Sequence, residues 1–302
     1  MARWRTSSAP MKSSAADSGA VTLIQRFGSA ANLTAHVRYV EMLGNFLRFD
    51  LGKSFLQNKE VWQLIKEKLP VSISLGLWTF LISYAISVPL GVAKAVREGT
   101  RFDALTTLGV LLGYAIPGFV LGVLLIVLFA GGSFLDWFPL RALTSDNWEE
   151  LSAWGKVKDY VWHLALPLTC LVIHQFAVVT LLTKNTFVEE IRKQYVLVAR
   201  AKGLSQQRVL YKHIFRNALI PLVTGFPAAF IGAFFAGSVL IETLFSLDGL
   251  GLLSYESVVR RDYPVVLGSL YLFTLIALVV KLVSDVLYTV VDPRVQFGAA
   301  GK

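Results

Sequence analysis

The sequence has very few side chains of the kinds that build disulfides, metal sites or hydrolytic centres. Its single cysteine, Cys170, lies inside an apolar stretch, so the chain has no disulfide framework. The four histidines are scattered along the sequence, and no two of them have the spacing of metal ligands. No nucleophile stands beside a base in a known catalytic pattern. We therefore expect no catalytic residue and no bound metal in this chain.

The sequence also lacks a complete nucleotide-binding loop. The stretch DLGKS, residues 50–54, ends as a phosphate-binding loop does, with Gly52, Lys53 and Ser54 in that order. Leu47 occupies the place of the earlier glycine that such a loop needs, and no buried strand precedes it. We expect a helix to end at Gly52, and we expect that the chain itself binds no ATP or other cofactor.

Charged residues are scarce. They make up 16% of the 302 residues against 55% hydrophobic residues, and the mean hydropathy is +0.58. This composition is too apolar for a soluble domain of that size and predicts an all-α, polytopic membrane protein in contact with the lipid bilayer. The net charge of +9 would suggest a nucleic-acid partner in a soluble chain, but here most of the excess lies in one loop. We therefore expect no nucleic-acid partner.

Five apolar segments are long enough to cross a bilayer, which takes about 20 helical residues. The loop 184–216 between the third and fourth segments holds eight Lys or Arg against two Glu, so the positive-inside rule places it in the cytoplasm. The segments 131–160 and 241–263 are net acidic and are predicted to lie outside. The predicted spans are 71–93, 105–130, 161–183, 217–240 and 264–290.

Small residues predict close helix packing in two of the spans. The second span contains two GxxxG pairs and a proline, and the fourth span has small residues at spacings of four, three and four along one face. Such faces let a neighbouring helix approach closely, within the chain or in another subunit. The residues are Gly109, Gly113, Pro117, Gly118 and Gly122 in the second span, and Gly225, Ala229, Gly232 and Ala236 in the fourth.

The basic loop 184–216 is predicted to form two helices separated by a break. Thr186 and Glu189 have the spacing of a capping box, so a helix should begin there. Gly203 can adopt the left-handed conformation that ends a helix, and Ser205 can cap the next one. The first helix should carry an apolar stripe of Phe187, Ile191, Tyr195 and Val198, and the second a basic face of Arg208, Lys212 and Arg216.

The end of this loop resembles a known family. Residues 195–221 read YVLVARAKGLSQQRVLYKHIFRNALIP. They resemble the cytoplasmic coupling loop of permeases in ATP-driven importers of the dipeptide, oligopeptide and nickel group, whose pattern is Y-V-x-x-A-R-A-K-G-L followed by H-x-x-R-N-A-x-x-P. Within that group the sequence resembles the Yej branch, whose importers take up peptides and microcin C. The resemblance covers about residues 21–297, through DLGKS, LPVSISLGLW, GYAIPGF, IETLFSLDGLGLL, RRDYPVV and DPR.

The resemblance implies a fold, a function and partners. The fold would be that of a type I ABC importer permease, a multi-pass protein of the bacterial inner membrane. The function would be import of peptides or peptide-like solutes, microcin C among them, by a subunit with no ATPase site of its own. ATP and Mg would bind to a cytoplasmic ATPase subunit. A second, related permease would complete a heterodimer, and a periplasmic solute-binding protein would deliver the solute.

The resemblance and the chain order also suggest candidate sites. Polar residues within a span favour a solute pathway, with an internal hydrogen bond as the alternative, so His174 and Gln175 are pathway candidates. Lys281 and Asp285 share a helix face and are expected to form an ion pair or to anchor the helix end. The ATPase-docking candidates are Ala199, Arg200, Ala201, Lys202, Gly203, Leu204 and Arg208. The candidates for an external gate or a binding-protein contact are Glu242, Asp248, Gly249 and Gly251.

The predicted domains are a disordered N-terminus (1–20), an external amphipathic segment (21–69) and a transmembrane permease domain (70–297). Five spans with the basic loop inside place residues 1–70 outside, although they carry ten Lys or Arg. We therefore expect that the first helix of the family fold is missing ahead of this sequence.

Two other classes of function remain as alternatives. An ion-driven secondary transporter would need paired broken helices and several carboxylates within the membrane. The spans offer essentially Asp285 alone. An intramembrane enzyme would need a nucleophile with a base, or a metal set.

Overall fold

The computed structural model describes residues 30–130, 134–235 and 239–291. Within these ranges the regular structure is helical, apart from one antiparallel bridge between Lys53 and Glu60. The chain divides into two compact units, Met1–Gly52 and Lys53–Lys302, and the second unit contains all the candidate membrane spans. The all-α prediction is thus confirmed. The predicted disordered segment 1–20 lies outside the described residues.

The first unit contains helix α2 (Ala30–Leu47), which agrees with the amphipathic helix expected in this region. Tyr39, Leu43 and Leu47 on this helix are exposed. The helix ends at Leu47 and not at Gly52, because Phe49 has a φ of 59° and takes the chain out of the helical conformation.

Three unbroken helices of the second unit are long and apolar enough to cross a membrane. They are α3 (Val61–Val96), α6 (Ala153–Ile191) and α13 (Tyr263–Val291), and they contain the first, third and last predicted spans. α3 and α6 have 36 and 39 residues, well beyond the about 20 that a bilayer requires. The hydropathy pattern located these spans correctly but missed the turns of helix that extend beyond the membrane.

The second and fourth predicted spans are bent pairs of helices. The second is α4 (Arg101–Ala115) followed by α5 (Gly118–Phe129), and the two axes meet at 89°. Pro117 has no N–H for a helical bond, and Ile116 before it is extended, with a ψ of 117°, so a straight helix is impossible there. The predicted span over 105–130 therefore consists of two helices with a sharp bend at Pro117.

The fourth span also has a break, at the end that follows the basic loop. The helical segment Gln206–Ala218 meets α10 (Ile220–Phe235) at 46°. Pro221 lies in the first turn of α10, where its missing N–H prevents the preceding helix from continuing straight through Leu219. The described residues thus contain three unbroken candidate spans, and five if each bent pair is counted as one span.

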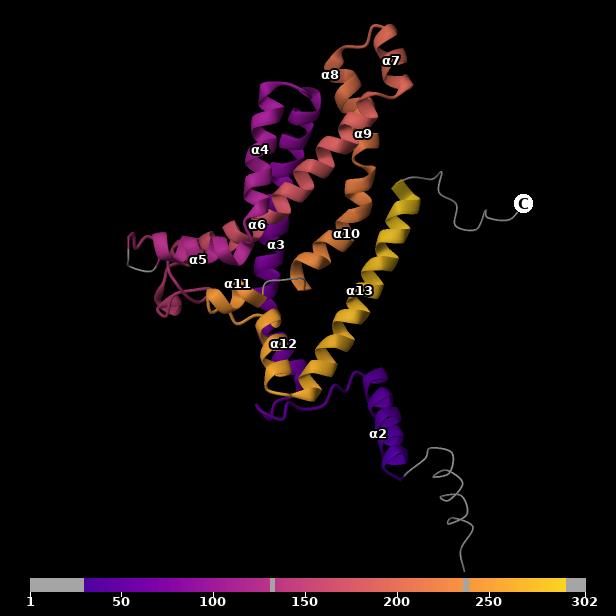
Figure 1. Cartoon of the computed structure of the whole chain (residues 1–302). Helices are drawn as coiled ribbons and strands as arrows, with labels where there is room; N and C mark the ends of the chain where they lie inside the picture. Colours follow the sequence, from indigo (N-terminus) through magenta and orange to yellow (C-terminus); the bar gives the residue numbers. More distant parts are fainter. Residues whose placement is uncertain (1–29, 131–133, 236–238, 292–302) are drawn as a thin grey trace, which may run out of the picture. The chain divides into compact units, whose positions relative to one another are not determined.

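The two longest helices, α3 and α6, lie side by side and form the centre of the second unit (Figure 1). Gly91 on α3 makes this contact possible, because a Cβ at that position would lie 2.5 Å from Cβ of Thr183 on α6. α10 packs against both α3 and α13. On the outer side, the short helices α11 (Val239–Leu244) and α12 (Leu250–Val259) contact α5 and α3.

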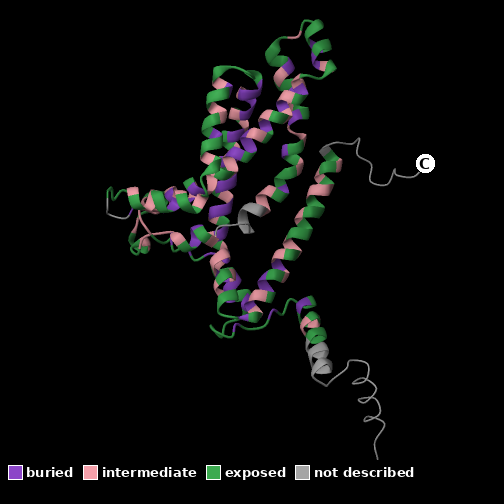
Figure 2. Ribbon diagram, viewed as in Figure 1, coloured by how far each residue is buried: buried purple, intermediate pink, exposed green. Residues whose placement is uncertain are grey.

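Two buried apolar clusters stabilise the second unit at different levels. The first joins α3, α6 and α11 through residues that include Leu75, Cys170 and Phe245. The second joins the cytoplasmic end of α3 to the basic loop. Exposed apolar side chains cover much of α5 and α13 (Figure 2). Such faces are suited to contact with lipid or with another membrane subunit.

The small-residue faces pack as predicted in only part of the chain. A Cβ at Gly122 would lie 2.6 Å from Cδ2 of Leu244, and one at Gly113 would lie 3.2 Å from Cγ2 of Ile173, so both glycines allow close contacts. A Cβ at Gly109 or Gly225 would meet nothing within 4 Å. Of the fourth-span face, Ala236 and the side-chain surroundings of Gly232 lie outside the described residues.

Candidate functional site

The basic loop 184–216 forms a compact group of short helices at one end of the second unit (Figure 1). After α6 ends at Ile191, the chain forms α7 (Gln194–Ala201) and α8 (Gln206–Arg208). A π-helical turn (Val209–Ile214) and α9 (Phe215–Ala218) then lead into α10. The same end of the unit contains the α3–α4 connection, as shown by a 3.0 Å ion pair between Arg192 and Glu98. Both connections thus lie at the same end of the second unit.

The predicted helix start at Thr186 is wrong. α6 continues through this residue, and Thr186 Oγ1 donates a hydrogen bond to the Thr183 carbonyl within the same helix. The chain breaks at Arg192 and Lys193 instead. Glu190, and not Glu189, stabilises this break, because its buried carboxylate accepts a hydrogen bond from Tyr195 Oη at 2.9 Å and pairs with Lys193.

Phe187, Ile191 and Tyr195 of the predicted apolar stripe pack in or against one buried cluster, but Val198 does not, because the break restarts the helical periodicity. Val198 is 53% exposed, whereas Val196 and Ala199 are buried. Burial, reinforced by the Glu190 carboxylate, raises the pKa of Tyr195 to about 12. We call the buried cluster at this end the loop core. It contains Val92 and Ala95 of α3 together with Phe187, Val196, Ala199, Val209, Ile214 and Ala218.

The glycine break and the cap of the next helix agree with the sequence. Gly203 has a φ of 76°, and its N–H donates to the Arg200 carbonyl at 2.9 Å. Ser205 Oγ accepts a hydrogen bond from the Arg208 N–H at 3.4 Å. The π-helical turn that follows alters the regular spacing, so Arg208, Lys212 and Arg216 do not share a single α-helical face, although all three are exposed.

The seven candidate docking residues divide into two groups. Ala199 is buried in the loop core and contributes to the shape of the loop from inside. Leu204 is partly buried. Exposed at the tip of the loop are Arg200, Ala201, Lys202, Gly203 and Arg208. The surface that a partner could contact is therefore small and basic, and the loop core fixes it to the end of α3.

Beneath the loop, three charged side chains that sequence reasoning did not select form a buried network. Lys94 on α3 is fully buried, and its Nζ lies 3.1 Å from Oδ1 of Asp103 in the first turn of α4. Lys184 on α6 donates to the same carboxylate. The Lys94 ammonium also donates to Thr106 and Thr107. The network joins α3, α4 and α6, and no local sequence pattern signals a contact between positions 103 and 184.

At the opposite end of the unit, three of the four candidate gate residues lie together. The Glu242 side chain is fully buried on α11, and its Oε2 accepts a hydrogen bond from the Leu252 N–H at 2.7 Å. Gly249 and Gly251 leave space for this carboxylate, because a Cβ at Gly249 would lie 2.6 Å from its Cδ. Asp248 is exposed and pairs with Lys68. A carboxylate at the start of α12 complements the positive end of that helix.

A second outer contact was not expected. Asp262 before α13 accepts a hydrogen bond from Ser54 Oγ, and its Oδ1 accepts one from the Phe55 N–H at 3.0 Å. Ser54 belongs to the DLGKS stretch that resembles part of a phosphate-binding loop. In this structure its hydroxyl instead helps to connect residues 54–57 to the start of α13. The two partners are 208 residues apart, so no pattern in the sequence connects them.

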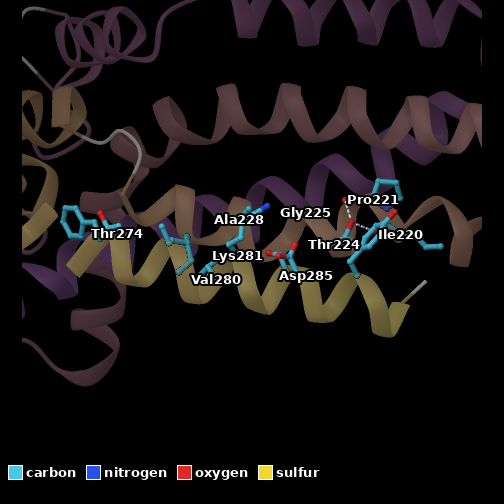
Figure 3. Close-up of a pocket in the computed structure, with 14 residues that line it drawn as sticks. Ile220, Pro221, Thr224, Gly225, Ala228, Thr274, Val280, Lys281 and Asp285 are labelled. Carbon is cyan, nitrogen blue, oxygen red and sulfur yellow. Dashed lines mark hydrogen bonds between the residues drawn. The ribbon is translucent and has the colours of Figure 1, made fainter. Parts of the chain in front are cut away.

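The two pathway candidates lie on α6, and the expected Lys281–Asp285 pair lies elsewhere, on α13. His174 on α6 is exposed, and its ring stacks on Tyr114 of α4 with 4.7 Å between ring centroids, while Gln175 is partly buried. Lys281 and Asp285 lie in a groove between α10 and α13 (Figure 3), and no ion pair joins them in the described part of the chain. The described residues also contain no group of three His, Cys, Asp or Glu side chains that could hold a metal.

Comparison with known proteins matches residues 87–297 to the family described as binding-protein-dependent transport system inner membrane component. The peptidoglycan transport system permease protein YejB of Agrobacterium fabrum is 59% identical over 260 residues, which cover 86% of this chain and 71% of that protein. The inner membrane ABC transporter permease protein YejB of Escherichia coli O157:H7 is 55% identical over 262 residues, 87% of this chain and 72% of that protein.

A more distant relative and a solved structure extend the comparison. The oligopeptide transport system permease protein AppB of Bacillus subtilis is 34% identical over 275 residues, 91% of this chain and 84% of that protein. A chain of the inward-facing MetNI methionine ABC transporter superposes with a TM-score of 0.57. The superposition covers 76% of this chain and 97% of that chain at 16% identity, so it shows the fold alone. The fold is that of a type I ABC importer permease.

Proposed function

The chain belongs to the family of binding-protein-dependent transport system inner membrane components, and we propose that it is the permease subunit of an ATP-driven importer of peptides or peptide-like solutes. The proposal rests on the sequence identity between this chain and two permeases, which is 34–59% over most of the chain. The names of these permeases refer to peptidoglycan and oligopeptides. None of the relatives reported above is an ion-driven transporter. Microcin C remains a candidate solute on the resemblance of the Yej branch alone.

The basic tip of the loop is the proposed contact with the ATPase. Arg200, Lys202 and Gly203 are exposed there, while the loop core fixes the tip to the end of α3. A push on the tip would therefore move α3 and α6 together. The bends at Ile116–Pro117 and near Leu219 are places where α5 and α10 could change angle relative to that pair. ATP and Mg would bind to the ATPase, outside this chain.

The remaining partners follow from the family and from the exposed faces. A second, related permease would supply the other half of the pathway, and it would contact the exposed apolar faces of the spans. A periplasmic binding protein would deliver the solute to the outer side, near α11 and α12. The buried Glu242 carboxylate lies in the space that Gly249 and Gly251 leave for it, and we call this site the Glu242 pocket. It would hold this outer segment in shape, and the exposed Asp248 would be available for contact. The expected place of the complex is the bacterial inner membrane.

Uptake by the reconstituted complex tests this function. Vesicles with no ion gradient are prepared with the chain, a partner permease and the ATPase, and the binding protein is added. Accumulation of labelled trialanine in the vesicles is then measured. We expect accumulation with ATP and none with a non-hydrolysable ATP analogue. Accumulation that needs an imposed ion gradient and not ATP would refute the proposal in favour of an ion-driven transporter.

A further inference from the structure

A groove of about 910 Å³ lies between α10 and α13 (Figure 3). Its wall on α10 includes Thr224, Gly225 and Ala228, and its wall on α13 includes Lys281 and Asp285. A Cβ at Gly225 would meet nothing within 4 Å, so the absence of a side chain there leaves free space in the groove. The volume lies within the range of about 300–1,000 Å³ that is usual for small-molecule sites.

The groove contains polar groups without partners. The Lys281 ammonium and the Asp285 carboxylate are one helical turn apart, and neither makes an ion pair or a side-chain hydrogen bond within the described part of the chain. Ser284 Oγ is buried and has no hydrogen-bond partner there. The rest of the lining is mostly apolar. Unpaired charges facing lipid are costly, so the part of the groove beside Lys281 and Asp285 is suited to charged groups of an occupant.

We propose that this groove binds the zwitterionic form of a short peptide, with its carboxylate at Lys281 and its ammonium at Asp285. This inference rests on the proposed function and adds the site of the solute to it. Side chains at positions i and i+4 of a helix are about 5–6 Å apart at their Cβ atoms. Two or three extended residues span about 7–10 Å, and the long Lys281 side chain can extend away from Asp285, so the two ends of a very short peptide can reach both charges.

The position of the groove connects it to the coupling loop. α10 begins at Ile220, directly after the short helices of the loop, and both Ile220 and Pro221 line the groove. A change in the 46° bend between the loop and α10 would alter the width of the groove. The proposed site therefore lies on the cytoplasmic side of the pathway, where movement of the loop would release the solute.

Protection of an introduced thiol tests occupancy. The variants are made in a Cys170→Ala chain, so that the introduced cysteine is the chain's single thiol. The chain is assembled with its partner permease and the ATPase in vesicles. The Ala228→Cys thiol is then labelled with a small methanethiosulfonate. We expect millimolar trialanine to slow this labelling at least fivefold in chains with native Lys281 and Asp285. The Lys281→Gln and Asp285→Asn double variant should remove most of the protection, because each charged hydrogen bond is worth about tenfold or more in affinity. Val290→Cys, which is exposed and outside the groove, should show no protection.

Capped peptides test the assignment of the two charges. N-acetylated trialanine has no ammonium, so it should protect Ala228→Cys equally with native Asp285 and with Asp285→Asn. Trialanine amide has no carboxylate, so it should protect equally with native Lys281 and with Lys281→Gln. Lys281→Arg, which keeps the cation, should retain protection by free trialanine. A purely structural role of these residues would not produce this crossed pattern.

Two results would overturn the inference. One is labelling of Ala228→Cys at the same rate with and without trialanine, in a complex whose ATP-driven uptake is normal. The other is an Ala228→Cys thiol that reacts in the chain alone and becomes unreactive whenever the partner permease is present, which would make the groove a contact between subunits. Failure of the proposed function is a different observation, namely absence of ATP-driven trialanine uptake by the wild-type complex.

Discussion

Lys184 on α6 donates hydrogen bonds from its Nζ to both carboxylate oxygens of Asp103 at the start of α4, at 2.8 and 2.7 Å. The fully buried Lys94 of α3 lies 3.1 Å from the same carboxylate. A single anion thus holds two cations and three helices together beneath the basic loop. This contact and the loop core join α3, α4 and α6 at the end of the unit that holds the basic loop.

Replacing Asp103 should destabilise the protein strongly. Asp103→Asn leaves two cations near each other with no anion between them, and breaking a buried ion pair costs about 3–5 kcal/mol. Thermal melting of the detergent-solubilised complex should show a clear drop in the midpoint temperature. Glu149→Gln, which removes one partner of a highly exposed pair with Lys156, is the matched control and should leave the midpoint unchanged. Equal melting of the two variants would contradict the structural role of Asp103.

Gly203→Pro should separate ATP hydrolysis from transport. Proline fixes φ near −65° and has no N–H, whereas Gly203 has a φ of 76° and donates to the Arg200 carbonyl. The tip of the loop would therefore change shape while the spans remain intact. We expect normal membrane insertion and continued ATPase activity with uptake reduced at least tenfold, since the loop transmits the motion. Gly203→Ala costs only about 1–2 kcal/mol locally and should keep most of the uptake. Normal uptake by Gly203→Pro would be inconsistent with this role of the loop.

The Glu242 pocket predicts different effects of the same substitution at two nearby glycines. A Cβ at Gly249 would lie 2.6 Å from the Glu242 carboxyl carbon, whereas one at Gly251 would come no closer than 3.1 Å to the carboxylate. Neither glycine has a positive φ. Gly249 is the N-cap of α12, where glycine is preferred to alanine, and Gly251 lies within the helix, where alanine is preferred, so space and helix propensity predict the same order. Gly249→Ala should therefore lower the melting temperature more than Gly251→Ala does. It should also reduce more strongly the stimulation of ATP hydrolysis by the binding protein. A larger effect at Gly251 would show that the carboxylate does not occupy this position.

Hydropathy and charge predicted the parts of the fold that depend on the membrane. The positions of the five apolar segments follow from the length of the apolar runs. The cytoplasmic side of the basic loop stays a prediction from its excess of Lys and Arg. Gly203 and Ser205 were also predicted correctly, because a left-handed glycine and a serine cap act within a few residues of themselves.

Local patterns failed where a distant contact decides the structure. Thr186 has the sequence of a capping residue, but packing of Phe187 in the loop core keeps α6 helical beyond it. The contacts of Asp103 with Lys184 and of Ser54 with Asp262 join residues 81 and 208 positions apart, so no helical or strand period signals them. The groove beside Lys281 and Asp285 depends on how far α10 and α13 separate, which the sequence of either helix alone does not specify.

The most direct test of the account is whether the tip of the basic loop touches the ATPase. The experiment uses a Cys170→Ala chain that retains transport. A short thiol-to-amine crosslinker is attached to Lys202→Cys at the tip of the loop. The control is the same crosslinker on Lys158→Cys, in the predicted outer segment. We predict covalent capture of the ATPase subunit from Lys202→Cys and none from Lys158→Cys. A fully active complex in which Lys202→Cys never captures the ATPase, or in which a membrane-impermeant reagent added outside labels it, would contradict the central claim.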